Sequence, residues 1–381
     1  MDKSKPVNTF KIMRVLLIIV VIYLLLTNYD MDHSSIPQSF DAPTIDEIGT
    51  DQDKGNFIGI QPFMEPIDYA SDSNFFRKLN HYFSAAQSKD LLNEKSIVVL
   101  PEHIGTWLVA QNERKLVYTS NKIEEAMRAV VVRNLLSFLP EYFSADEEDQ
   151  SKAAVFRVKS TQMAISYAHV MRSLASRYRV TVVGGSIILP SPKVEIDSLL
   201  VESGPLYNAS FVFYPNGSLD PQITKKAFPV MDEQTIIASA KPEELPVYNT
   251  QAGDLAVMIC ADSWYLASYE TAQKKGATLL AIPSYSTGDK LWATKWKGYN
   301  GAPSPPNVDA SDIGNITEEM AWLKYSMGGR AQQAGIVQGI NVFLRGNLWD
   351  MGSDGKTISM KEGGLKMNDA DQKSTITCLW F

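Results

Sequence analysis

Residues 254–264 read DLAVMICADSW. The apolar run at 255–259 is typical of a buried strand, and the residues from Ser263 onward indicate the start of a helix. Cys260 therefore stands where a strand meets a helix, and a thiol in that position would feel the positive end of the helix, which favours the thiolate. A buried structural cysteine at the end of a strand is the other interpretation of this residue.

Strand-like and helix-like patterns alternate on both sides of this stretch. Short apolar runs predict strands at 56–63, 96–102, 180–189, 254–260, 277–286 and 340–347, and a hairpin over 206–219 that turns at Pro215-Asn216-Gly217. Helical spacing of apolar residues predicts helices over 73–93, 160–178, 264–276 and 317–335. Repeated strand–helix–strand units with buried strands indicate an α/β fold with covered sheets.

One region, 104–159, interrupts this alternation. It contains the apolar segment MRAVVVRNLLSFLPEYF (127–143), which is followed by the acidic DEED (146–149). One interpretation is an inserted helical hairpin that packs on the body of the protein. The other is a lid over the active site or an element that faces a membrane.

The N-terminal region carries the longest apolar run, VLLIIVVIYLLL at 15–26, with four cations before it and none after it until Lys54. This charge bias predicts a single-pass membrane anchor within residues 1–30 and an extracytoplasmic catalytic domain. The run is shorter than the roughly 20 residues that a spanning helix needs. A cleaved signal peptide and a cytosolic chain therefore stay open as alternatives. The polar stretch 31–55 predicts a linker, and 56–381 the domain itself.

The composition limits the classes of protein that the chain can belong to. Of 381 residues, 45% are hydrophobic, and 43 acidic against 36 basic residues give a net charge of −7, which disfavours broad binding to nucleic acid. Only Cys260 and Cys378 are present, which excludes a disulfide framework. Four histidines without a His/Cys cluster argue against a zinc site, and no cofactor is expected. Three Asn-X-Ser/Thr sequons begin at Asn208, Asn216 and Asn315.

Two further groups of chemically interesting residues precede Cys260 in the chain. Glu102 ends the predicted strand SIVVLPE, and a carboxylate at the C-terminal end of a strand lies at the rim where α/β folds bind ligands. Lys225 and Lys226 precede AFPVMDE, which contains Glu233. Considered alone, a glutamate at this rim is usually a solvated residue without a catalytic role, and a pair of lysines usually lies on the protein surface.

The order Glu, Lys, Cys resembles that of the nitrilase or carbon–nitrogen hydrolase superfamily. The successive blocks VVGGSIIL (182–189), YNASFVFYPNGSL (207–219), LAVMICADSW (255–264), KGATLLAIPS (275–284) and QGINVFLRGNLWDMGSDGK (338–356) look like those of the family. The resemblance covers residues 56–358 and implies a four-layer α-β-β-α sandwich with a Glu–Lys–Cys triad.

The resemblance assigns a role to each residue of the triad. Glu102 would be the general base, Cys260 the nucleophile, and Lys225 the cation that stabilises the oxyanion. Many members have a second glutamate eight residues after the lysine, which would be Glu233 and which favours Lys225 over Lys226.

Further residues near the triad are expected to complete the site. The backbone N–H of Ala261 would share the oxyanion with the lysine, and Trp107 and Trp264 are expected to form walls of the substrate pocket. Asp262 matches an acidic residue that the family often has after its cysteine, and His103 could touch the site or be an ordinary rim histidine.

The predicted activity is hydrolysis of a non-peptide, amide-type carbon–nitrogen bond through a cysteine thioester. The alternative is an N-acyltransferase that resembles the catalytic domain of apolipoprotein N-acyltransferase, in which an amine rather than water resolves the thioester. A binding module without activity is the third possibility. The expected partners are a small amide or acyl substrate, the membrane through the N-terminal segment, and a second copy in a homodimer.

Overall fold

The computed structural model describes residues 29–300, 304–368 and 373–381, together with scattered positions between 10 and 23. Within these residues, no helix has both the length and the apolar character that crossing a bilayer requires. The predicted anchor falls mostly outside the described positions.

The first of two large sheets has six strands of mixed direction. Its order is β1 (Thr44–Ile48), β19 (Thr375–Trp380), β2 (Asn56–Gln61), β4 (Ser96–Val99), β5 (Thr181–Val183) and β10 (Val212–Phe213). The pairs β1–β19, β2–β4 and β4–β5 are parallel, whereas the pairs β19–β2 and β5–β10 are antiparallel. The last strand of the chain therefore lies inside the sheet.

The second large sheet also has six strands. Its order is β12 (Val247–Thr250), β13 (Gly253–Val257), β14 (Leu279–Ser284), β15 (Gln338–Phe343), β17 (Ile358–Lys361) and β18 (Gly364–Met367). The strands β13, β14 and β15 run parallel, and antiparallel strands flank them on both sides.

The two large sheets pack face to face through a buried apolar layer. Phe57 and Val99 of the first sheet belong to the same cluster as Val257 and Ile340 of the second. Gly59 permits this close approach, because a Cβ at that position would lie 2.6 Å from Cδ1 of Ile340. The sheets thus form the centre of the molecule, and their outer faces need helices to cover them.

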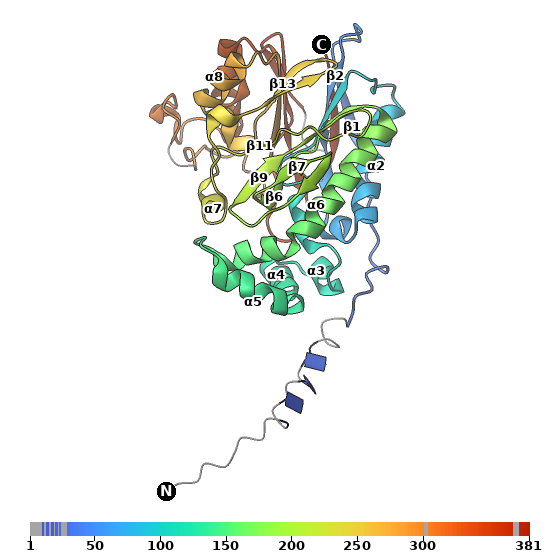
Figure 1. Cartoon of the computed structure of the whole chain (residues 1–381). Helices are drawn as coiled ribbons and strands as arrows, with labels where there is room; N and C mark the ends of the chain where they lie inside the picture. Colours follow the sequence, from blue (N-terminus) through green and yellow to red (C-terminus); the bar gives the residue numbers. More distant parts are fainter. Residues whose placement is uncertain are drawn as a thin grey trace.

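Helices cover both outer faces. On the first sheet lie α2 (Asp72–Gln87) and α6 (Gln150–Tyr178), and on the second lie α8 (Leu266–Lys274), α9 (Glu318–Tyr325) and α10 (Met327–Arg330). Figure 1 shows α2 and α6 on one side of the sheets and α8 on the other. Two of these helices differ in extent from the prediction. The helix predicted to begin at residue 160, α6, begins ten residues earlier, and the helix predicted over 317–335 is divided into α9, α10 and the short helix η6 (Ala331–Ala334).

Small sheets and turns complete the body. The small sheets are β11 (Thr224–Lys225) with β9 (Leu206–Ser210) and β6 (Ile187–Pro190), β3 (Phe63–Met64) with β16 (Arg345–Gly346), and β7 (Lys193–Glu195) with β8 (Ser198–Leu200). The other short helices are η1 (Pro66–Tyr69), η2 (Thr106–Ala110), α7 (Met231–Gln234), η3 (Pro242–Glu244), η4 (Cys260–Trp264) and η5 (Ala310–Asp312).

The strand predicted over 180–189 is two strands, β5 and β6, in different sheets. The break falls at Gly184-Gly185, where Gly185 has a φ of +67°. A Cβ on Gly185 would lie 2.1 Å from the carbonyl oxygen of Pro101, so only glycine lets the chain pass so close to the residue before Glu102. The glycine pair therefore helps to shape the end of β4.

The predicted linker is partly structured. Residues 44–48 form β1, which pairs in parallel with β19 at the edge of the first sheet. The prediction of a linker over 31–55 was wrong there, because this short acidic strand carries little apolar signal of its own and is stabilised by a partner more than 300 residues away in the chain.

The inserted region is helical. It contains η2, α3 (Lys115–Thr119), α4 (Ile123–Arg133) and α5 (Leu135–Ser144). Figure 1 shows α3, α4 and α5 together at the lower end of the folded body. Glu113 joins these helices to α6, since its buried carboxylate accepts from Lys159 at 2.5 Å and from Asn134 at 2.9 Å. The insertion is thus part of the folded body.

Candidate active site

The ends of three strands bring an acid, a cation and a thiol to one place. Glu102 follows β4, Lys226 follows β11, and Cys260 follows β13. All three residues line one cavity of about 1520 Å³. The three strands belong to three different sheets, and β11 pairs antiparallel with β9, so the site lies where the ends of both large sheets and of a small sheet come together.

The lysine in this cavity is Lys226. Its Nζ lies 2.7 Å from Oε1 of Glu102 and 2.5 Å from Oε2 of Glu233, and its side chain is 1% exposed. Nζ of Lys225 instead lies 4.3 Å from the centre of the Tyr207 ring. The prediction of Lys225 was wrong by one residue, because neighbouring residues in extended chain point to opposite faces and the spacing to Glu233 is seven rather than eight.

Opposite charges keep Lys226 and Glu233 ionised although both are buried. Burial alone would lower the pKa of Lys226, but the carboxylates of Glu102 and Glu233 outweigh it and raise the pKa well above its usual range. Burial alone would raise the pKa of Glu233, but Lys226 and His103 hold that pKa well below its usual range. The lysine is therefore a fixed positive charge at neutral pH.

The two glutamates differ in their free hydrogen-bonding capacity. Glu233 uses both oxygens: Oε2 accepts from Lys226 and from a backbone N–H, and Oε1 accepts from Asn208 at 3.0 Å and faces Nε2 of His103 at 3.5 Å. Glu102 accepts from Lys226 and Asn208 through Oε1 alone. Among the residues that the structure describes, Oε2 of Glu102 has no hydrogen-bond donor. Glu102 is thus the carboxylate that can take up a proton.

Cys260 holds an uncommon backbone conformation, with a φ of +47°. Its Sγ lies 3.8 Å from the carbonyl oxygen of Tyr285, which can accept the thiol proton in a weak hydrogen bond. Burial and the negative charge of Glu102 raise the pKa of this thiol well above its usual range, and Lys226 opposes them only in part. Burial therefore opposes the shift toward the thiolate that the start of a helix was expected to give. The turn that follows is the short helix η4, and α8 begins only at Leu266.

Asp262 connects the loop of the lysine to the turn of the cysteine. Its Oδ1 accepts from the N–H groups of Ala227 at 3.0 Å and Phe228 at 2.8 Å, and its Oδ2 accepts from Ile259 at 3.3 Å. Burial raises the pKa of this carboxyl to about 7, against the lowering effect of Lys226 and of the three N–H groups. Asp262 is therefore a positioning residue for the two groups.

The expected pocket residues lie on the same cavity. Ala261, Trp107 and Trp264 all line it. The ring of Trp107 packs edge to face on Trp349 with centres 5.6 Å apart, and Trp264 stacks on Trp296 at 6.0 Å. Their contact with a substrate stays a prediction.

Sequence reasoning missed Asn208. It appeared only as the first residue of a sequon, yet its fully buried amide donates to both glutamates. The pairing of β9 with β11 places it there, and the N–H of Lys226 donates to the carbonyl oxygen of Asn208 at 2.9 Å. The signal that could have found it is the strand alternation of 206–210 beside the lysine pair.

The same cluster could suggest a metal site. One ligand atom each from Glu102, His103 and Glu233 lies within 4.8 Å of the others. The ammonium of Lys226, however, already contacts both carboxylates and would repel a divalent cation. The residues present do not fit a metal ion.

A comparison with known families agrees with this geometry. The sequence profile described as Carbon-nitrogen hydrolase matches residues 70–298, a range that contains Glu102, Lys226, Glu233 and Cys260. This chain belongs to the carbon-nitrogen hydrolase family. One curated relative, "Probable hydrolase YhcX" of Bacillus subtilis (strain 168), is 24% identical over 237 residues, which are 58% of this chain and 43% of that protein. The chain thus spans less than half the length of this relative.

Solved structures of the family share the fold. A mutant of the Nesterenkonia AN1 amidase from the nitrilase superfamily matches with a TM-score of 0.51 and 12% identity, over 86% of this chain and 90% of that one. Another mutant of the Nesterenkonia amidase, which carries the acetamide moiety of fluoroacetamide at its active-site cysteine, matches with a TM-score of 0.50 and 12% identity, over 86% and 90% of the two chains. The fold is thus an α/β nitrilase-like fold with two mixed sheets.

Proposed function

We propose that this carbon-nitrogen hydrolase cleaves a non-peptide, amide-type bond through a thioester on Cys260. The observation that carries the proposal is the convergence of Glu102, Lys226 and Cys260 on one cavity, with Lys226 held positive and the thiol held neutral. The covalent adduct on the cysteine of the Nesterenkonia amidase mutant supports the same chemistry.

The first half of the reaction forms the thioester. Oε2 of Glu102 takes the thiol proton as Sγ of Cys260 bonds to the amide carbon, because the raised pKa of the thiol keeps it protonated until then. The carbonyl becomes an oxyanion. An ammonium has three donors, and Glu102 and Glu233 accept two of those on Lys226, so the third is left for the oxyanion. The C–N bond then breaks, and the leaving nitrogen takes the proton from Glu102.

The second half releases the acid. Glu102 accepts a proton from water as the water oxygen bonds to the thioester carbon, and the C–S bond breaks. The departing sulfur regains its proton from Glu102. Glu233 stays ionised throughout, because its pKa is held low and its oxygens are occupied, and it serves to position Lys226.

The test uses the two cysteines of the chain as a matched pair. Cys260→Ala is expected to abolish release of ammonia from simple amides, and Cys378→Ala, which removes a buried thiol of the first sheet, is expected to retain it. Mass spectrometry of quenched enzyme should find an acyl group on Cys260. Full turnover in a folded Cys260→Ala protein contradicts the proposal, and transfer of the acyl group to an added amine instead of water points to an acyltransferase.

We also propose that residues 15–26 tether the enzyme to a membrane, with the catalytic domain on the extracytoplasmic side. The cations before this run and their absence after it support the orientation. Membrane fractions washed with carbonate should retain the full chain, and protease added outside intact cells or spheroplasts should digest the catalytic domain. Recovery of a mature chain without its first residues in the soluble fraction contradicts the tether.

A further inference from the structure

The cavity at Cys260 is larger than a small amide needs. Its volume of about 1520 Å³ exceeds the 300–1000 Å³ that is usual for small-molecule sites. From Cys260 and Lys226 it extends to the inserted helices, so that α4 and α5 share its lining with the catalytic residues. We call the part of the cavity lined by α4 and α5 the α4–α5 arm.

The α4–α5 arm is apolar inside and charged only at its rim. Its lining includes Met127, Val131, Phe138, Leu139 and Phe143. The charged residues of α4 that share the lining are Glu124 and Arg128, and the side chain of each is 71% exposed. An apolar cavity of this kind favours a hydrocarbon chain, since the gain comes from apolar area removed from water.

Apolar side chains continue from the arm onto the surface. Val132 is 51% exposed, Leu136 61%, Leu139 40% and Phe143 78%. They lie on α4 and α5, and Val132, Leu139 and Phe143 also line the arm. Neighbouring exposed apolar side chains of this number mark an interaction surface rather than ordinary solvent-facing residues.

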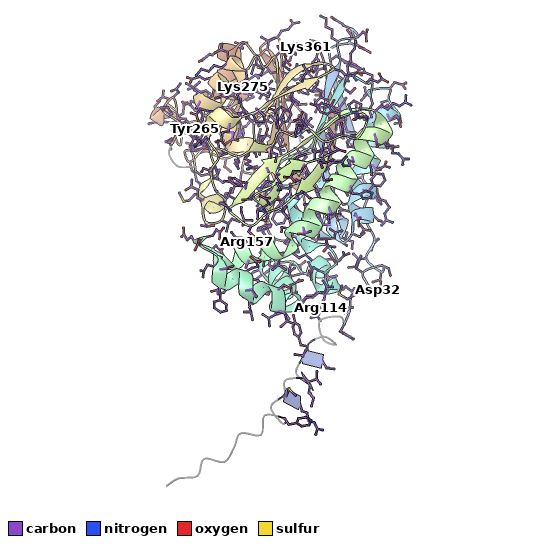
Figure 2. The ribbon with its side chains drawn as sticks, viewed as in Figure 1. Asp32, Arg114, Arg157, Tyr265, Lys275 and Lys361 are labelled. Carbon is purple, nitrogen blue, oxygen red and sulfur yellow. The ribbon has the colours of Figure 1, made fainter. Side chains whose placement is uncertain are left out.

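One residue of the N-terminal apolar run contacts the junction between α4 and α5. The hydroxyl of Tyr23, in the apolar run 15–26, donates to the carbonyl oxygen of Arg133 at 2.8 Å and accepts from the N–H of Leu135 at 3.0 Å. The N–H of Lys115 donates to the carbonyl oxygen of Asp30 at 2.9 Å. Figure 2 shows Asp32 and Arg114 at the end of the molecule where Figure 1 shows α3, α4 and α5. If residues 15–26 enter a bilayer, the α4–α5 surface faces it.

We propose that the substrate is an amide with a long aliphatic chain, which lies in the α4–α5 arm and enters it from a lipid bilayer against the exposed side chains of α4 and α5. This proposal rests on the proposed hydrolysis at Cys260 and names the substrate class of that site.

The first experiment measures kcat/KM of the full chain for acetamide, hexanamide and decanamide, and for N-alkyl acetamides of matched length. For one of the two series, kcat/KM should rise about fourfold for each added methylene until the arm is filled, the gain expected from burial of one CH₂. The mass of the adduct on Cys260 tells whether the chain lies on the acyl or the amine side of the bond.

The second experiment places a charge in the arm. Val131→Asp should lower the ratio of kcat/KM for decanamide to that for acetamide at least tenfold, because a carboxylate in the arm opposes a hydrocarbon. Leu139→Asp, at a more exposed position of the same lining, serves if Val131→Asp does not fold. Ile196→Asp is the control, since Ile196 is fully exposed at the β7–β8 turn, outside the cavity lining, and its change should leave the ratio as in the wild type.

The third experiment tests the bilayer. Leu136 is exposed on α5 but is absent from the cavity lining. Leu136→Asp should lower the rate with hexadecanamide in phosphatidylcholine vesicles, relative to the rate with hexanamide in solution, at least fivefold.

The outcomes separate this inference from the proposed function. Adducts on Cys260 with short amides, but no dependence on chain length and no effect of Val131→Asp, overturn the long-chain substrate and leave the hydrolysis standing. An unchanged vesicle-to-solution ratio in Leu136→Asp overturns entry from the bilayer. No adduct with any amide overturns the hydrolysis and the inference with it.

Discussion

The ammonium of Lys226 lies 2.7 Å from Oε1 of Glu102, and both side chains are almost completely buried. Removal of one member of a buried ion pair leaves the other charge in a low-dielectric interior, which usually costs 3–5 kcal/mol. The pair therefore contributes to the stability of the site as well as to its chemistry, so both the activity and the thermal stability of each variant must be measured.

The two adjacent lysines provide a matched test of this assignment. Lys226→Met is expected to lower kcat by at least about 10²-fold, because the oxyanion loses its fixed positive charge, and to lower Tm. Lys225→Met removes only a cation–π contact with Tyr207, so kcat/KM should stay within about threefold of wild type. Steady-state kinetics and thermal unfolding of both variants check this. A larger loss of activity in Lys225→Met would return the catalytic role to that residue.

The raised pKa of the Cys260 thiol gives a pH-dependent prediction. Alkylation by iodoacetamide, which consumes thiolate, should still be accelerating at about pH 9, where an ordinary thiol is largely ionised. The negative charge of Glu102 is one cause of the raised pKa, so Glu102→Gln should lower the pKa and speed alkylation at about pH 8 by roughly 3–10-fold. The same variant should lose hydrolysis, since it loses the base.

These rates are measured in a Cys378→Ser background, so that one thiol reacts. If the rate of alkylation of this Cys378→Ser protein reaches its plateau near neutral pH, Cys260 is a thiolate at rest, which contradicts the raised pKa of its thiol.

The lysine pair also shows which features of the site can be predicted from the sequence and which cannot. The pattern of strands predicted an α/β fold, and the resemblance that rests on the order Glu102–Lys–Cys260 predicted one site for Glu102, Glu233 and Cys260, which all line the same cavity. Their catalytic roles stay predictions. Which of two adjacent lysines enters the site depends on the face of β11 that turns inward, and that face is set by pairing with β9. No local pattern at 225–226 contains this information.

Long-range pairing accounts for the other misses. β1 pairs only with β19, more than 300 residues away, β19 is held between β1 and β2, and Asn208 enters the site because β9 carries it there. The helices of the insertion were visible as an apolar segment, but whether they cover the cavity depends on buried contacts such as the one between Glu113 and Lys159. Contacts between distant residues are where the sequence alone has least to say.

Asn208 is expected to matter through both glutamates. Asn208→Ala removes its hydrogen bonds to Glu102 and Glu233, and hydrogen bonds to charged groups contribute about 1.5–3 kcal/mol each. We expect kcat/KM to fall at least about tenfold and the protein to unfold at lower urea concentration. Asn249→Ala is the control, because Asn249 makes a comparable bond to Asp254 on the exposed edge strand β12. Equal effects of the two variants would show that Asn208 has no special role in the site.

Glu113 is expected to hold the inserted helices in place. Its Oε1 accepts from Lys159 at 2.5 Å and lies 3.4 Å from Nη1 of Arg133, and its side chain is fully buried. Glu113→Ala leaves the buried Lys159 without its carboxylate, so the free energy of unfolding should fall by about 3–5 kcal/mol. Lys159→Met added to Glu113→Ala should recover part of the loss, because no uncompensated ammonium then remains. Glu125→Ala, at an exposed position of α4, is the control. Urea unfolding measures the free energy of unfolding of each variant. Hydrogen exchange should show faster opening of α4 and α5 in Glu113→Ala than in the control. Equal protection of α4 and α5 in the two variants would show that apolar packing alone holds the insertion.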